Sequence, residues 1–216
     1  MKNIKNYFNT FLKGLLAGLC IAIGGWLYIK TRDAGSSSVL AAFLFPIGLI
    51  LICNFGYFLY TGKICYLINH IKNKNGGSYT VHLAFGLIGN YVAATLIGLL
   101  LKNMFNVPSF VNAMVETKMG YEWWKLIILG IFCGVLIYLA VEAFANIENI
   151  FGKYVILILC VAGFIICGFE HCIADMFYFA VGGLFSIKSI GVLSLIVLGN
   201  SLGGLLIPIV RRIINE

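Results

Sequence analysis

Long apolar stretches constrain this chain more than any other feature of its sequence. An α-helix needs about 20 predominantly apolar residues to cross the hydrocarbon core of a bilayer. Six stretches approach or exceed that length: 11–29, 39–60, 79–101, 125–145, 154–180 and 189–210. Of the 216 residues, 61% are hydrophobic and only 11% are charged, which excludes an ordinary soluble domain. The sequence therefore predicts an all-α membrane protein with six transmembrane helices in a single domain, 1–216.

The basic residues indicate how these helices are oriented. The net charge is +7, and the Lys and Arg residues gather at the ends of the apolar stretches. That placement is typical of membrane topology, so no nucleic-acid partner is expected. With an even number of spans, both termini lie on one side, which carries eight basic residues against six on the other. The positive-inside rule then predicts cytoplasmic termini in an inner (plasma) membrane.

The two halves of the chain resemble each other. Gly18 and Gly56 are 38 residues apart, as are Gly130 and Gly168, and a Gly-Asn pair lies in the third apolar stretch of each half. Because three spans is an odd number, the second half must enter the membrane from the opposite side. This is the inverted 3+3 repeat of many transporters and channels. Chance spacing of 25 glycines is the alternative; the expected repeats are about 8–102 and 118–212.

The repeat also aligns two interruptions, which predict broken second and fifth helices. NFGYFLYTGK (54–63) occupies the place in the first half that CGFEHCIADM (167–176) occupies in the second. A broken helix at membrane depth is tolerated only where its backbone lines a cavity or is buried in protein. The half-helix that restarts offers free N–H groups and the positive end of a dipole. Two such breaks meeting at the midplane of an aquaporin-like hourglass pore would favour an anion.

Several segments resemble the formate–nitrite transporter family, and together they cover nearly the whole chain. GFEHCIADMF (168–177) is close to the family's most specific signature, Gly-Phe-Glu-His followed by Ala-Asn-Met. The resemblance implies a homopentamer in the lipid bilayer, with one pore per protomer. It also implies passage of formate, nitrite or hydrosulfide, often coupled to protons; no cofactor or metal site is visible. The other matching segments are KGLLAGLCIAIGGW (13–26), FPIGLILICNFGYFLYTG (45–62), IGNYVAATLIG (88–98) and LGNSLGGLLIP (198–208).

The resemblance implies roles for particular residues. His171 matches the central pore histidine, Lys118 the vestibule lysine, and Thr61 the threonine of the first broken loop. The implied apolar constrictions are Phe45, Leu49, Tyr60 and Phe164, and the supporting polar network comprises Glu170, Asp175, Lys63, Asn90 and Asn200. The chain departs from the family where Phe58 replaces Glu, Gly134 replaces Asn, Lys63 replaces a small polar residue and Asp175 replaces Asn.

The chemistry of these side chains fits an anion pathway. Ionisable groups inside a membrane are candidates for functional sites, and an imidazole donates a hydrogen bond in either charge state. We expect His171 to link transport to protons. Lys118 would attract the anion, or would simply snorkel to the interface. Thr61 would donate to the anion or cap the following half-helix, and Glu170 would satisfy backbone N–H groups at the break.

Lys63 and Asp175 occupy aligned positions in the two repeats. A single unpaired charge at such a position would be costly, and buried charges normally occur in pairs. We therefore predict a salt bridge between Lys63 and Asp175 that holds the two half-helices together. The alternative is that Lys63 snorkels to the surface.

Two other functions fit the sequence less well than anion transport. Gly199-Asn200-Ser201-Leu202-Gly203 superficially resembles a serine-hydrolase turn, but in intramembrane serine proteases the serine precedes its histidine, and here it follows. No HExxH zinc motif is present, so no enzyme is predicted. A neutral-solute channel like those for water or glycerol would need paired Asn-Pro-Ala breaks, which the three prolines do not form.

Overall fold

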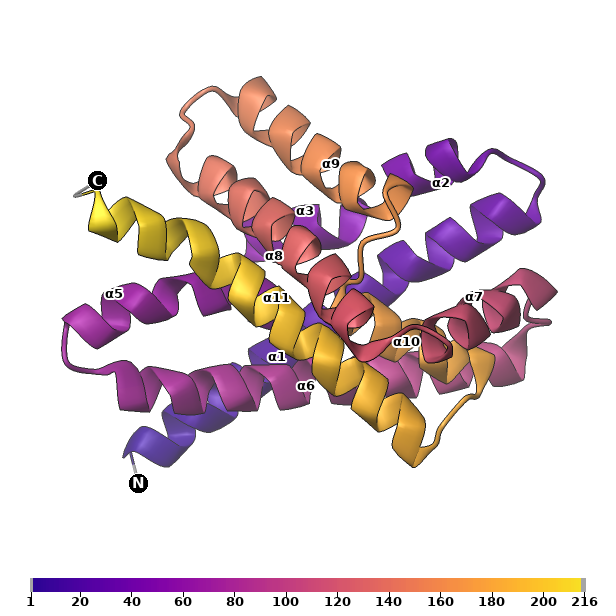
Figure 1. Cartoon of the computed structure of the whole chain (residues 1–216), viewed down its shortest axis with the longest axis horizontal. Helices are drawn as coiled ribbons and strands as arrows, with labels where there is room; N and C mark the ends of the chain where they lie inside the picture. Colours follow the sequence, from indigo (N-terminus) through magenta and orange to yellow (C-terminus); the bar gives the residue numbers. More distant parts are fainter. Residues whose placement is uncertain (1, 215–216) are drawn as a thin grey trace.

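The computed structural model describes residues 2–214, and the regular elements in that range are all helices (Figure 1). The ends of the predicted domain, residue 1 and residues 215–216, lie outside the described residues. The predicted all-α class is confirmed. The elements are α1 (Lys2–Asp33), α2 (Ser38–Leu44), α3 (Ile47–Phe55), α4 (Tyr60–Lys63), the 3-10 helix η1 (Ile64–Tyr66), α5 (Leu67–Lys72), α6 (Gly76–Met104), α7 (Ser109–Met119), α8 (Trp123–Asn146), α9 (Ile150–Ile166), α10 (Cys172–Gly182) and α11 (Ile187–Ile213).

Five helical segments are long and apolar enough to cross a membrane, judged by length and composition over the described residues. They are α1 from Ile4, α2 together with α3, α6, α8 and α11. The predicted fifth span, 154–180, is divided into α9 and α10, of 17 and 11 residues. The predicted second span, 39–60, likewise stops at Phe55 and resumes at Tyr60. The six-span plan with broken second and fifth helices is therefore confirmed.

Local signals in the sequence set several helix ends. Ser37 begins α2 by accepting a hydrogen bond from the Leu40 N–H, and Asn149 begins α9 in the same way from Gly152. Ser186 and Ser189 form a capping box at the start of α11. Pro46 lies between α2 and α3, where its missing N–H interrupts the helical hydrogen bonds.

Glycines bring the long helices of each half into close contact. Helix α1 crosses and contacts α6, and α8 likewise contacts α11 (Figure 1). A Cβ atom at Gly18 would lie 2.5 Å from the Asn90 carbonyl oxygen, and one at Gly134 would lie 2.4 Å from the Asn200 carbonyl oxygen. Small residues at such crossings allow the backbones to approach.

These contacts correct one detail of the predicted repeat. The sequence alignment equated Gly18 with Gly130, but Gly18 and Gly134 occupy equivalent positions against the third helix of each half. The first helices are therefore offset by four residues, about one turn, from the alignment that matches the two breaks. Counting glycines along the sequence does not reveal this offset, because Gly130 and Gly134 both contact α11.

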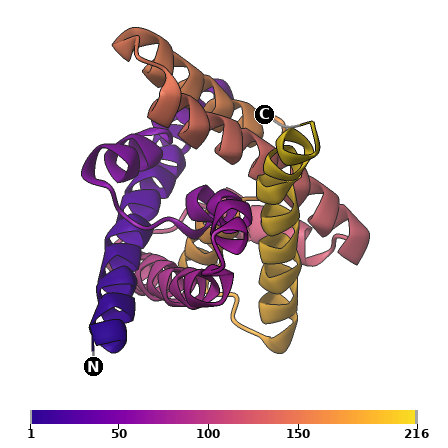
Figure 2. The same ribbon diagram turned by 90° about the vertical axis from the view of Figure 1, so that its left-hand side faces the viewer.

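The half-helices after the breaks lie inside the protomer. Figure 2 shows the segment after the first break between α1, α6, α8 and α11, and Tyr60, Thr61 and Gly62 of α4 are buried. Helix α5 continues from there to the outer end of the molecule, where none of its residues is buried (Figure 1). Helix α10 packs on α6, α1, α11 and α7. Both ends of the described chain lie at the same end of the long axis (Figure 1). The two breaks are thus held between long helices from both repeats.

Candidate functional site

Each break contains a glycine in the left-handed conformation. Gly56 has φ of 66° and Gly168 has φ of 69°. Residues with a Cβ rarely adopt this conformation, so glycine is the residue that ends the preceding helix here at low cost. The sequence alignment paired these two glycines, and the structure gives them the same backbone role.

A buried asparagine holds each break in place. The Asn90 Oδ1 accepts a hydrogen bond from the Tyr60 N–H at 2.9 Å, and its Nδ2 donates to the carbonyl oxygens of Gly14 and Phe58 at 2.8 and 2.9 Å. Asn200 makes the equivalent set in the second half: it accepts from the Cys172 N–H at 2.9 Å and donates to the carbonyls of Gly130 and Glu170 at 2.9 and 2.8 Å. Each amide therefore ties one break to the first and third helices of its own repeat.

His171 and Thr61 connect the two breaks. The His171 Nε2 lies 2.9 Å from the Thr61 Oγ1, and both residues are buried. His171 is also the N-cap of α10, where its Nδ1 accepts from the Ala174 N–H at 3.2 Å. A neutral imidazole with Nδ1 as acceptor carries its hydrogen on Nε2. His171 therefore donates to the Thr61 oxygen, which leaves the threonine hydroxyl hydrogen for another acceptor. The alternative role of Thr61, capping the following half-helix, is wrong, because the N-cap residue of α4 is Leu59 and Thr61 lies within the helix.

Lys118 is paired with two carboxylates. Its Nζ forms ion pairs with the Glu170 Oε2 and, at 2.8 Å, with the Asp175 Oδ1. Burial alone would lower the pKa of the Lys118 ammonium, but the carboxylates of Asp175 and Glu170 raise it above its usual value. The expectation that the Glu170 side chain satisfies backbone N–H groups is wrong, since its carboxylate contacts Lys118 instead.

The predicted Lys63–Asp175 salt bridge is also wrong. Asp175 is paired with Lys118, and Lys63 places its Nζ over the Tyr66 ring, 5.5 Å from the ring centre. Equivalent positions of an inverted repeat lie on opposite sides of the pseudo-two-fold axis. The two residues consequently line different cavities.

Two cavities lie close to the His171–Thr61 pair: His171 lines one, and Gly62, the residue after Thr61, lines the other. The Lys118 cavity, of about 270 Å³, is lined by Arg32, Phe45, Lys118 and His171 among others. The Lys63 cavity, of about 360 Å³, is lined by Leu49, Gly62, Lys63 and Tyr66 among others. The last turns of α1 line one cavity and the last turns of α8 line the other, and these helix ends lie at opposite ends of the molecule (Figure 1). A third cavity of about 680 Å³ adjoins the Lys63 cavity at Tyr66 and Ala145.

Three of the four residues predicted to form constrictions, Phe45, Leu49 and Phe164, line these cavities. Phe45 faces the Lys118 cavity, and Leu49, one helical turn further, faces the Lys63 cavity. The Phe164 ring contacts Phe45 edge-on at 6.0 Å and stacks on the His171 ring at 5.6 Å. Tyr60 lines neither cavity, and its hydroxyl forms a hydrogen bond of 2.8 Å with the Ser201 Oγ. The imidazole is thus bounded by aromatic and aliphatic side chains.

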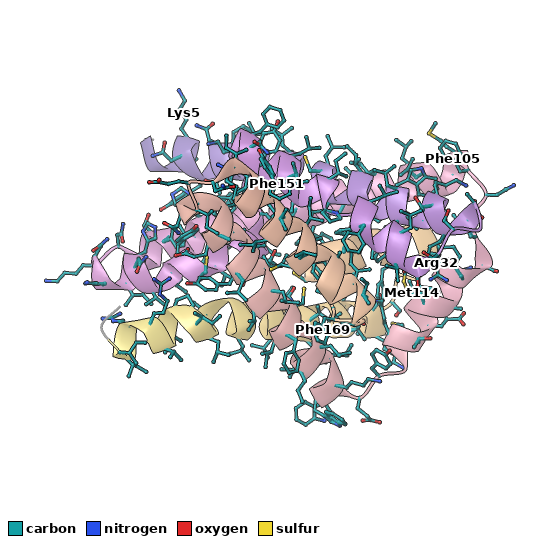
Figure 3. The ribbon with its side chains drawn as sticks, turned by 90° about the horizontal axis from the view of Figure 1, so that it is seen from above. Lys5, Arg32, Phe105, Met114, Phe151 and Phe169 are labelled. Atoms are coloured by element: carbon teal, nitrogen blue, oxygen red, sulfur yellow. The ribbon has the colours of Figure 1, made fainter. Side chains whose placement is uncertain are left out.

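Arg32 was not predicted as a site residue. It lines the Lys118 cavity, and its guanidinium lies over the Phe110 ring, 4.6 Å from the ring centre. Figure 3 labels Arg32, Met114 and Phe169, which come from α1, α7 and the second break and all line this cavity. An arginine at the end of a membrane helix carries no local signal that separates it from an interfacial anchor.

Ser201 and His171 belong to different hydrogen-bond networks. The Ser201 Oγ donates to the Val197 carbonyl at 2.6 Å and contacts Tyr60, whereas His171 is bonded to Thr61. Over residues 2–214, no three His, Cys, Asp or Glu side chains are grouped as metal ligands would be.

Comparison with known proteins decides the family. A sequence profile described as formate/nitrite transporter matches residues 1–213. The chain belongs to the formate/nitrite transporter family. This family consists of membrane transporters and channels and not of enzymes, so the chain is a multi-pass transport protein for small anions.

Relatives of this formate/nitrite transporter include two curated proteins and a solved structure. The formate channel FocA of Haemophilus influenzae is 25% identical over 194 residues, which cover 82% of this chain and 68% of that protein. The formate-nitrite transporter of Entamoeba histolytica is 27% identical over 217 residues, covering 90% and 60%. A solved pentameric formate channel with formate bound covers 98% of both chains with a TM-score of 0.75 and 24% identity, which shows the shared fold. The chain spans about two thirds of the length of these curated relatives.

Proposed function

We propose that this chain forms a homopentameric channel for small monovalent anions of weak acids, with formate as the first substrate and nitrite and hydrosulfide as further candidates. The observation that carries the proposal is the buried Thr61–His171 hydrogen bond near two cavities, which are lined by helix ends at opposite ends of the protomer. Residues 1–216 would act as one channel domain. The relative named as a formate channel and the solved pentamer with formate bound support both the substrate and the assembly.

The pair would replace part of the water that an anion loses. Transfer of a bare anion into an apolar constriction is strongly unfavourable. The His171 Nε2–H and the Thr61 hydroxyl are two donors at the narrow region between the cavities. A hydrogen bond to a charged group contributes about 1.5–3 kcal/mol. Phe45, Leu49 and Phe164 would keep water out of this region, so that the donors act in a low-dielectric environment.

The proposal also includes a proton that His171 transfers to the anion during transport. A proton neutralises formate, nitrite or hydrosulfide and so removes most of the cost of crossing an apolar region. His171 would take up this proton at Nδ1, which requires its hydrogen bond from the Ala174 N–H to break. It would then donate the Nε2 proton to the anion, which leaves a neutral imidazole with its hydrogen on Nδ1; moving that hydrogen back to Nε2 would restore the bond from Ala174.

The proposed location is the inner (plasma) membrane with both termini in the cytoplasm. Both ends of the described chain lie on the same side of the molecule (Figure 1). Eight basic residues fall on that side and six on the other, in agreement with the positive-inside rule.

Uptake into proteoliposomes tests this function. We expect purified protein to accelerate uptake of labelled formate, and to a different degree nitrite and hydrosulfide, over liposomes without protein. Glycerol is the control for a neutral-solute pore and should enter no faster than through lipid alone. Acceleration of glycerol but not of the three anions would contradict the proposal.

A further inference from the structure

The cluster formed by Lys118, Glu170 and Asp175 has an unbalanced charge. Its lysine contacts both carboxylates. With all three groups ionised, one positive charge faces two negative charges. The exposed fractions of the three side chains are 12%, 4% and 2%, so water screens this excess negative charge poorly.

One carboxylate oxygen in this cluster has no partner. The Asp175 Oδ2 is buried and accepts no hydrogen bond from any residue that the structure describes. Buried polar atoms nearly always have a partner, and an ionised oxygen without one is especially costly. Two carboxylates that share a buried site do not both ionise readily. A proton on this pair would remove the excess charge and give the second oxygen a role as a donor.

The neighbouring groups do not supply a second positive charge to the cluster. The titratable and charged side chains around it are Tyr28 and Arg32 on α1, Tyr121 between α7 and α8, Cys133 on α8, Cys172 and Tyr178 on α10, and His171 in the break. Arg32 is the cation among them, and it lies against aromatic rings, with its Nη1 3.4 Å from the Tyr28 hydroxyl. Helices α6 and α11 also pack on α10 but contribute no residue to the lining of this cavity.

We propose that Glu170 and Asp175 together bind one proton in the resting channel, so that the cluster is a proton-binding site in the wall of the Lys118 cavity. With the proton bound, the cluster is neutral and an anion enters the cavity. Without it, one net negative charge remains beside the entrance and repels the anion. An asparagine at position 175 would leave one ammonium and one carboxylate, which is neutral without any proton. This inference rests on the proposed anion transport, which it extends by a pH-dependent entrance.

Infrared spectroscopy of the purified full-length protein in lipid tests the proton directly. A protonated carboxyl group has a carbonyl stretch distinct from the bands of a carboxylate. We expect this band at neutral pH, its reversible loss as the pH rises, and its absence in Asp175→Asn. The matched control is Glu142→Gln, because the Glu142 ion pair with Arg211 lies outside the cluster and is partly exposed; its spectrum should keep the band. Absence of the band from the wild type at neutral pH, or its persistence in Asp175→Asn, would overturn the proposal.

A transport measurement tests the consequence separately. Carboxylic acids have pKa values of about 4, so formate is almost fully ionised near neutral pH and above. We expect wild-type uptake to fall several-fold as the pH rises through the titration seen by infrared spectroscopy. This decrease in uptake with pH should be several-fold smaller in Asp175→Asn. An equal decrease in the variant and the wild type would show that the proton site does not control anion entry. If the infrared titration appears as expected but the wild type transports no anion, the proposed anion transport is rejected and the proton-binding site is still supported.

Discussion

At the scale of single residues, His171 makes three contacts with three different roles. Its Nδ1 caps α10, its Nε2 contacts Thr61 of the other repeat, and its ring stacks on Phe164. These contacts fix both the orientation and the tautomer of the ring. A histidine held in this way is a defined donor at one point of the pathway, which explains why a single residue in the signature has a large expected effect.

Replacement of His171 by Gln and by Phe separates its two proposed roles. Gln keeps an N–H donor but takes up no proton, whereas Phe removes both. We expect Gln to retain part of the formate uptake without its proton linkage. We expect Phe to reduce uptake about 10- to 100-fold, which corresponds to the loss of one hydrogen bond to a charged group. Uptake measured at several pH values, together with the pH of the medium, checks both; wild-type flux and pH dependence in Phe would contradict the assignment.

Lys118 is expected to act on stability more than on anion capture, because two carboxylates already neutralise its charge. Lys118→Met leaves buried negative charge without a partner, and we expect a loss of about 3–5 kcal/mol. Lys125→Met is the control, since Lys125 lies over the Tyr121 ring and outside the cluster. Thermal unfolding of both variants checks this; equal unfolding temperatures would contradict it.

The pKa of Lys118 is raised, which determines the pH range in which the ammonium stabilises the protein. A raised pKa means that the contribution is fully present below the ordinary lysine pKa of about 10.4 and is lost only above it. Titration of Lys118 should therefore leave the unfolding temperature unchanged near neutral pH.

Among the helices, the close contact of α8 with α11 positions the second break. Asn200 lies at this contact, and its side chain holds the backbone of Cys172 and Glu170. Gly134→Ala would place a methyl group 2.4 Å from the Asn200 carbonyl oxygen. We expect a loss of about 1–3 kcal/mol, as for other overpacked contacts, and reduced transport. Gly163→Ala on α9 is the control, because no atom outside the adjoining part of α9 lies within 4 Å of the added carbon; similar losses in both variants would contradict this explanation.

The half-helix α4 brings its own cation to the Lys63 cavity. Over the described residues Lys63 forms no ion pair, so its charge is available to an anion there. We expect Lys63→Gln to raise the apparent KM for formate at low salt, and the effect to shrink as salt screens the charge. Lys153→Gln is the control: its ammonium lies over the Phe144 ring, and Lys153 does not line the cavity. An equal change in KM for both variants would assign the effect to general surface charge.

For the molecule as a whole, the sequence predicts those features that a local pattern of residues determines by itself. Long apolar stretches predicted the spans, and Gly56 and Gly168 predicted the breaks. Partners of charged side chains were harder to predict, because the repeat shows which positions are equivalent but not which are close. The predicted partner of Lys63, Asp175, is therefore wrong. The sequence does not mark Arg32 as a residue of the Lys118 cavity, because an arginine at a helix end is ordinary in membrane proteins.

An experimental structure of the assembled protein with formate would test the pore and the assembly together. We expect five copies, each with a formate oxygen about 3 Å from the His171 Nε2 or the Thr61 Oγ1, between the Lys118 and Lys63 cavities. Formate bound only outside this region, or a path that avoids His171, would contradict the proposed channel.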